Sequence, residues 1–160
     1  MSDFLITKEG LAKLRAEISN LKNVQRPAII EAVAEARDHG DLKENAEYHA
    51  AREKQGMIEA LIADYENKLG RAKEVDLSTF SGSVIRFGAK VKLENLDNEK
   101  IVTYQIVSEY ESNLENGLIS DQSPVARALL GKEEGDDVAI KTPGGVIDYE
   151  ILEVSYKNQL

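Results

Sequence analysis

Residues 36–51 read ARDHGDLKENAEYHAA and lie within a segment, from Thr7 to about Ala72, that has the composition of α-helices. Alanine, glutamate, lysine and leucine dominate this segment, and β-branched runs are almost absent. The stretch Asp38-His-Gly-Asp interrupts the helical pattern, and its glycine, Gly40, can adopt the left-handed conformation of a turn. Because such a short connection joins antiparallel neighbours, we predict an antiparallel helical hairpin.

Apolar side chains recur at helical spacing on both sides of this connection. Thr7 can cap the first helix, and Pro27 is expected to bend that helix without breaking it, because proline lacks a backbone donor. A helix of this length would extend about 45 Å, so the hairpin would form an arm with a small tip. The apolar positions are Leu11, Leu14, Ile18, Leu21, Ile29 or Ile30, Val33 and Ala36 in the first helix, and Met57, Ile58, Leu61, Ile62, Tyr65 and Leu69 in the second.

After Glu74 the composition changes to short, alternating and β-branched runs separated by turns. A short helix is expected between the strand groups, with Ser123 as its cap, Pro124 at its first position and Gly131 at its end. We therefore predict a two-domain α+β protein, with a helical arm over residues 1–76 and a small globular domain over residues 77–160. The expected strands cover residues 83–87, 90–93, 101–107, 137–141 and 146–152.

The charge and the composition limit the classes of function. The chain has 160 residues, no cysteine and a net charge of -9, which opposes unaided binding to a phosphate backbone. Most of the excess of acidic residues falls after residue 75, so the arm is nearly neutral. No signal peptide or membrane-spanning run is evident, and we expect a cytoplasmic protein without membrane contact.

Asp41 and Glu44, at the predicted tip, allow two interpretations. An aspartate at the N-cap with a glutamate three residues later forms a capping box, which satisfies free amides at the start of a helix. The same two carboxylates could instead bind Mg²⁺, but that ion takes six ligands, so another molecule would have to complete its shell. The second interpretation suggests a tip that enters the active centre of a partner.

Basic residues surround the same tip. Arg37, Lys43 and Arg52 could pair with nearby glutamates, or they could hold a phosphate backbone near the carboxylates. His39 and His49 do not have the spacing of metal ligands, and we expect structural roles for both.

The run at residues 36–51 closely resembles the signature of the GreA/GreB family of bacterial transcript-cleavage factors. The resemblance extends over essentially the whole chain, and several separate matches are more specific than one short motif. The basic patch is small and is interspersed with acidic residues, which favours the GreA branch of the family. The other matching segments are Arg26-Pro27, NGLIS at 116–120, SPVARALLGK at 123–132 and KTPGG at 141–145.

The resemblance implies a coiled-coil arm and a carboxy-terminal domain similar to the FK506-binding fold. It also implies a factor, not itself an enzyme, that enters the secondary channel of RNA polymerase as a monomer and stimulates cleavage of backtracked RNA 3′ ends. Asp41 and Glu44 match the acidic pair of the family, which would share a Mg²⁺ site with the polymerase. Arg37 and Arg52 match its RNA-contacting basic patch.

Three alternatives remain open from the sequence. An inhibitor of the same fold would occupy the channel without stimulating cleavage, although the run at the tip argues against this. A coiled-coil scaffold would form dimers, which the molecular mass in solution would reveal. A peptidyl-prolyl isomerase would need an aromatic-lined pocket, and the aromatic residues after residue 76 show no obvious cluster in the sequence.

Overall fold

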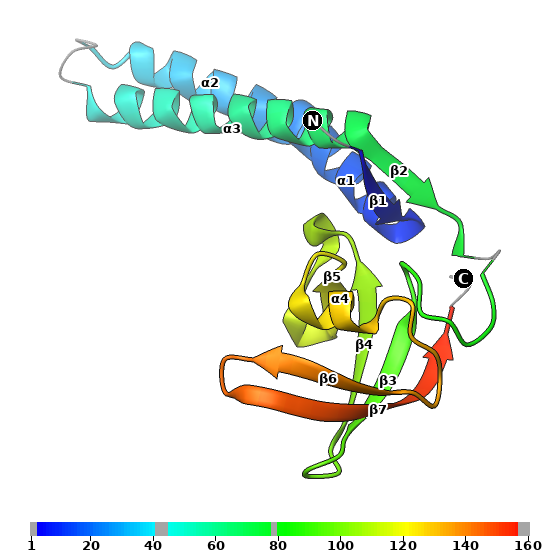
Figure 1. Ribbon diagram of the computed structural model, residues 1–160. Helices are drawn as coiled ribbons and strands as arrows, with labels where there is room; N and C mark the ends of the chain where they lie inside the picture. Colours follow the sequence, from blue (N-terminus) through cyan, green and yellow to red (C-terminus); the bar gives the residue numbers. More distant parts are fainter. Residues whose placement is uncertain (1–2, 41–44, 78–79, 157–160) are drawn as a thin grey trace. The chain divides into compact units, whose positions relative to one another are not determined.

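The computed structural model describes residues 3–40, 45–77 and 80–156. The chain forms two compact units, one of Leu11–Ala72 and one that combines Asp3–Gly10 with the chain from Lys73 onward. The first unit is helical and the second is built on a β-sheet, so the predicted two-domain α+β class is confirmed (Figure 1). The division predicted at residues 76 and 77 differs from these units, because residues 3–10 and 73–76 belong to the sheet unit.

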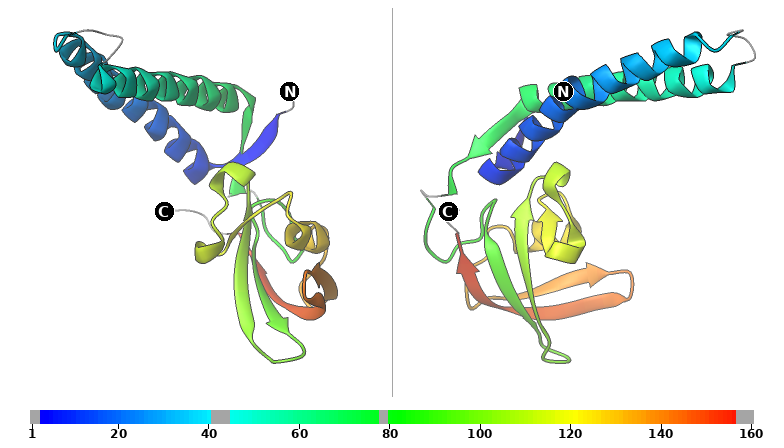
Figure 2. Two further views of the ribbon diagram at one scale, coloured as in Figure 1. Left: turned by 90° about the vertical axis from the view of Figure 1, so that its left-hand side faces the viewer. Right: turned by 180° about the vertical axis from the view of Figure 1, so that it is seen from behind.

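The helical unit is the antiparallel hairpin that the sequence predicts. Its first arm consists of α1 (Lys8–Asn20), the π-helical turn η1 (Leu21–Gln25) and α2 (Arg26–Arg37), and α3 (Ala46–Arg71) returns along it. Figures 1 and 2 show α2 and α3 side by side in all views. The apolar core of the hairpin consists of Leu21, Ile29, Val33, Ile58 and Ile62.

Pro27 distorts the first arm without ending it. The π-helical turn immediately precedes α2, and Pro27 lies in the first turn of that helix. Because proline has no N–H group, Pro27 cannot donate the i to i−4 hydrogen bond of a regular α-helix. The Arg26 N–H donates instead to the carbonyl of Leu21, five residues earlier, which is the π-helical pattern. The distortion predicted at Pro27 therefore takes the form of a π-helical turn before α2.

Only part of the predicted apolar stripes is buried. Ile58 and Ile62 lie in the hairpin core, whereas their neighbours Met57 and Leu61 are exposed. In the first arm Ile29 is buried and Ile30 is exposed. Two helices that pack only on each other have one inward face each, so adjacent residues cannot both be covered.

The chain enters α1 through a buried hydrogen-bond network. The Gly10 N–H donates to Thr7 Oγ1 at 3.0 Å, which confirms the predicted cap. The Glu111 carboxylate, which is buried, accepts from the Thr7 N–H at 3.2 Å and from the Thr7 hydroxyl group. It also accepts from Ser108 Oγ at 2.7 Å and from the Ser108 N–H at 3.2 Å. A side chain at Gly10 would overlap the carboxyl group of Glu111.

The sheet unit contains a five-stranded sheet in the order β5-β4-β3-β7-β6. All neighbouring pairs are antiparallel except β4 and β5, which are parallel. The short helix α4 (Pro124–Leu129) is capped by Ser123, whose hydroxyl oxygen accepts from the Ala126 N–H at 3.2 Å, as predicted. The strands are β3 (Lys90–Asn95), β4 (Ile101–Val107), β5 (Leu118–Ser120), β6 (Asp137–Thr142) and β7 (Gly145–Ser155).

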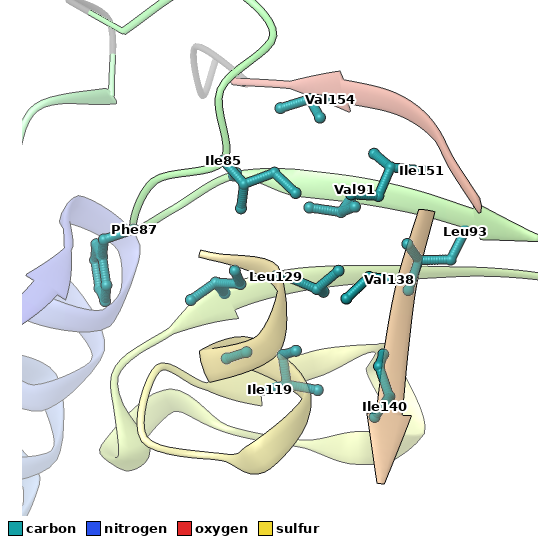
Figure 3. Close-up of a cluster of buried hydrophobic side chains, with 13 residues drawn as sticks. Ile85, Phe87, Val91, Leu93, Ile119, Leu129, Val138, Ile140, Ile151 and Val154 are labelled. Carbon is teal, nitrogen blue, oxygen red and sulfur yellow. The ribbon is translucent and has the colours of Figure 1, made fainter. Parts of the chain in front are cut away.

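The main core of the protein lies in this unit. Figure 3 shows Leu129 of α4 among apolar side chains of the sheet, including Ile140 and Ile151. Leu93, Val91 and Ile151 are fully buried. Two short 3₁₀ turns, η3 (Glu109–Glu111) and η4 (Leu114–Asn116), follow β4.

Four strands differ from the sequence prediction, and one of them is β5, which was not expected. Residues 83–87 do not form a strand, and only an isolated bridge joins Val84 to Glu133. Gly88, at a φ of 87°, turns the chain immediately after this run, and β3 begins at Lys90. Conversely, β1 (Phe4–Thr7) and β2 (Ala72–Val75) pair with each other, although the sequence suggested neither.

No helix among the described residues is both long enough and apolar enough to cross a membrane.

Candidate functional site at the end of the hairpin

The predicted acidic pair and its lysine neighbour lie outside the described residues, because residues 41–44 are not described. The structure does describe the residues immediately before and after them. α2 ends at Arg37, and the N–H of His39 donates to the carbonyl of Ala36 at 3.2 Å. Gly40 follows with a φ of 133°, a value that L side chains rarely adopt, as expected for the predicted turn glycine.

Asn45 joins the two arms of the hairpin. Its side-chain oxygen accepts from the Tyr48 N–H at 2.9 Å, which is the N-cap bond of α3. Its side-chain nitrogen donates to the carbonyl of Ala36 at 2.5 Å, near the end of α2. One amide thus satisfies a free donor of one helix and a free acceptor of the other. This bridge holds together the two chain ends from which residues 41–44 continue.

The N-cap of the second helix is Asn45. One of the two interpretations of the sequence made Asp41 the cap of the second helix, with Glu44 as its partner, and both residues lie outside the described ranges. α3 begins only at Ala46, and its N-cap is Asn45. Asparagine is as good an N-cap as aspartate, and here it also reaches α2, which an acceptor-only carboxylate cannot do.

The two predicted RNA-contacting residues meet at one tyrosine. Arg37, at the end of α2, lies over the Tyr48 ring, with its guanidinium carbon 5.9 Å from the ring centroid. Arg52, one turn further along α3, donates from Nη1 to the Tyr48 hydroxyl group at 3.4 Å. Both arginines are exposed and Tyr48 is half-buried. The structure therefore brings Arg37 and Arg52 together around a residue to which the sequence analysis gave no role.

The histidines have contacts typical of structural residues. His39 Nδ1 lies 3.3 Å from a carboxylate oxygen of Glu47, in an exposed pair. The rings of His49 and Tyr48 meet edge to face, with centroids 5.5 Å apart. Across residues 3–40, 45–77 and 80–156, no three histidine, aspartate or glutamate side chains cluster in a way that could hold a metal ion.

These features define a class of protein: an α+β protein with a helical hairpin whose polar cluster lies at its connecting end, and a separate sheet unit. Comparison with known families assigns both parts. Residues 4–73 match the family described as "Transcription elongation factor, N-terminal", and residues 81–156 match "Transcription elongation factor, GreA/GreB, C-term". The chain belongs to the GreA/GreB family of transcription elongation factors.

Individual relatives extend over nearly the whole chain. The transcription elongation factor GreA of Ruegeria pomeroyi is 53% identical over 156 residues, which cover 98% of this chain and 99% of the relative. GreA of Francisella tularensis subsp. novicida is also 53% identical, over 95% of this chain and 96% of the relative. Among solved structures, GreA factor homolog 1 of Thermus thermophilus is similar, with 28% identity, a TM-score of 0.44 and coverage of 96% and 99% of the two chains.

Asn45 and Tyr48 are the two residues at this end that the sequence analysis missed. A local signal for Asn45 existed, because asparagine immediately before a helical run is a preferred N-cap. A weaker signal existed for Tyr48, which lies four residues before Arg52 and hence on the same face of a helix. Its contact with Arg37 depends on the other arm and has no signal in local spacing.

Proposed function

We propose that this chain inserts the loop of its hairpin into the secondary channel of RNA polymerase and stimulates the polymerase's own Mg²⁺-dependent cleavage of backtracked RNA 3′ ends. Cleavage restores an end that can be extended and so rescues arrested complexes. The observation that best supports this function is the pairing of Arg37 and Arg52 on Tyr48, at the residues that flank Asp41 and Glu44. Membership of the GreA/GreB family further supports a role in transcription elongation.

Asp41 and Glu44 are assigned to a Mg²⁺ site that is shared with the polymerase. Their carboxylate oxygens are the kind of donor that Mg²⁺ prefers, but two carboxylates cannot fill six positions. The donor set therefore fits a partial site that a second protein completes. When bound there, a metal ion would supply stabilisation of the charge that develops on a phosphodiester during cleavage. The part of this chain would be to supply the two carboxylates and to orient the attacking water.

Arg37 and Arg52 are assigned to the extruded RNA. Arginine presents several N–H donors in a planar fork that matches phosphate geometry. A net charge of -9 opposes binding of free RNA, so the substrate would be met only where the polymerase holds it. In this scheme the chain is not itself an enzyme, it acts as a monomer, and it stimulates an activity that resides in its partner.

Isomerisation of prolyl peptides is a weaker candidate function for the sheet unit. An open depression of about 470 Å³ lies beside β4 and η4, and Tyr104 is the aromatic residue in its lining. Phe80 and Tyr156 do form an edge-to-face pair, with ring centroids 5.5 Å apart, although the sequence suggested no aromatic cluster. Tyr156 is tied to the backbone by a bond from the Arg86 N–H, so this pair is better explained as part of the fold.

The proposal is tested by adding the protein with Mg²⁺ to a backtracked elongation complex and following cleavage of the labelled transcript. The wild-type protein should accelerate cleavage. Asp41→Asn and Glu44→Gln should each abolish the acceleration and leave binding to polymerase nearly intact, because each removes a metal ligand and preserves the shape of the side chain.

Glu53→Gln provides the matched control, because Glu53 is an exposed carboxylate of α3 beyond the cluster at the hairpin end. It should accelerate cleavage as the wild type does. Undiminished cleavage with both tip variants would exclude the assigned roles. Binding without acceleration by the wild-type protein would favour the inhibitor interpretation instead.

A further inference from the structure

Tyr48 lies in the first turns of α3 and contacts side chains from both arms of the hairpin. Its ring faces the guanidinium group of Arg37 from α2, and its hydroxyl group accepts from Arg52 on α3. The next residue, His49, places its ring edge to face against the Tyr48 ring. Tyr48 is thus the meeting point of two cations that come from different helices.

Tyr48 is itself held in place from two sides. Its backbone N–H is the donor of the N-cap bond to Asn45, so its position at the start of α3 is fixed by the residue that also contacts α2. Its ring packs against the apolar core of the hairpin. A tyrosine side chain has only two rotatable angles, so a packed ring provides a rigid surface at small entropic cost.

The two contacts leave the arginines suited to a phosphate. A guanidinium over an aromatic face is attracted by the π-electrons, and this contact uses none of its N–H donors. The contact of Arg52 uses one N–H group. A free arginine side chain loses rotamer entropy when it is ordered, so arginines that are already ordered bind a phosphate at lower entropic cost.

We infer that Tyr48 is a positioning residue that holds Arg37 and Arg52 as one pair, oriented for the phosphate backbone of the extruded RNA. This role rests on the proposed function, because it concerns the RNA that would enter with the polymerase. Tyr48 needs no contact with the RNA or with the metal ion. Its effect is to order the two basic side chains before RNA arrives.

The test uses two substitutions that separate the contacts. Tyr48→Phe keeps the ring for Arg37 and removes the acceptor for Arg52, whereas Tyr48→Leu removes both. At saturating concentrations of the factor, we expect cleavage to slow about threefold with Tyr48→Phe and about tenfold with Tyr48→Leu. The concentration that gives half-maximal stimulation should stay within about twofold of wild type, because docking does not depend on Tyr48.

Double-mutant cycles distinguish positioning from a general loss of structure. In an Arg52→Ala background, Tyr48→Phe should cause no further loss, because the partner of the hydroxyl group is absent. In a background in which both Arg37 and Arg52 are replaced by alanine, Tyr48→Leu should likewise cause no further loss of cleavage rate. Tyr65→Leu is the matched control: Tyr65 also packs on the hairpin core, and Lys68 Nζ lies 5.4 Å from its ring centroid. This control should cleave at the wild-type rate.

A second measurement does not need the polymerase. The δ-proton resonances of Arg37 should carry a ring-current shift that persists in Tyr48→Phe and disappears in Tyr48→Leu.

The inference is overturned if the shift is absent from the wild type, if the Tyr48 variants cleave as the wild type does, if the losses add fully in the cycles, or if Tyr65→Leu is equally impaired. A wild-type protein that does not accelerate cleavage overturns the proposed function, and this inference with it.

Discussion

The hairpin and the sheet unit are stabilised in different ways. The hairpin buries an apolar cluster of five residues, and ion pairs connect its arms along the exposed edges, such as Arg26 with Glu59 and Lys22 with Glu66. The cluster in the sheet unit has thirteen buried members, drawn from all five strands, from α4 and from the segment before β3. Two packed helices form one thin layer, whereas a sheet covered by a helix encloses its side chains on more sides.

The two units also differ in where their most specific side-chain contacts lie. Much of the surface of the hairpin is polar, and its important contacts lie at its end, where Asn45 and Tyr48 organise a few side chains. The sheet unit has the enclosed core that supports a stable scaffold. Substitutions in the two units should therefore differ in magnitude and in where their effects are felt.

The largest expected effect comes from the two cores. Leu93→Ala, at a fully buried position of the sheet unit, should lower the free energy of unfolding by about 4 kcal/mol. Ile62→Ala in the hairpin should cost about 2 kcal/mol, because its thinner surroundings can collapse around the smaller side chain. Hydrogen exchange, resolved by residue, should show each loss of protection mainly in its own unit. Equal losses of protection in both units after either substitution would show that the two units unfold together.

A smaller effect is expected at the end of the hairpin. Asn45→Ala removes both the N-cap bond and the bond to Ala36 and should destabilise the start of α3 by about 1 kcal/mol. The Tyr48 N–H should then exchange about fivefold faster. Asn45→Asp keeps the acceptor for Tyr48 and loses the donor to Ala36, so it separates the cap from the bridge. If Asn45→Ala leaves exchange at Tyr48 unchanged, the cap bond does not stabilise the helix.

The smallest effect is expected from the exposed pair of Arg26 and Glu59. The hydrogen bond from Arg26 holds the pKa of Glu59 below its ordinary range, and the same bond raises the pKa of Arg26. A lowered carboxyl pKa stabilises the fold above the pKa of the unfolded chain, and this contribution disappears as the pH falls through the folded value. The difference in melting temperature between wild type and Glu59→Gln should therefore shrink on acidification from pH 7 to pH 3. A difference that is constant with pH would mean that the pair contributes nothing measurable.

Features that depend on short stretches of sequence could be predicted. The caps at Thr7 and Ser123 were confirmed, as were the strand over residues 101–107 and the distortion of the helix at Pro27. Each follows from the conformational preference of one residue or from a local period. The inward face of α3 was predicted only approximately, because adjacent residues such as Ile58 and Met57 are both apolar and only packing decides between them.

Features that depend on distant partners could not be predicted. β5 has three residues and exists because it pairs with β4, and β1 exists because it meets β2. Glu111 resembles an ordinary surface glutamate in the sequence, yet it is buried by its bonds to Thr7 and Ser108. At the candidate site, Arg37 and Arg52 were identified from family resemblance, but their common contact with Tyr48 requires both arms of the hairpin.

The close packing of Gly10 against Glu111 also restricts which substitutions the protein can accept. Any side chain at position 10 would overlap a carboxyl group that is held by Thr7 and Ser108 and cannot turn aside without losing those bonds. A larger residue at position 10 is therefore compatible with this arrangement only if a shorter side chain replaces Glu111. Such a replacement would in turn leave the Thr7 and Ser108 donors in need of another acceptor. Positions 10 and 111 are thus expected to change together or not at all as the sequence diverges.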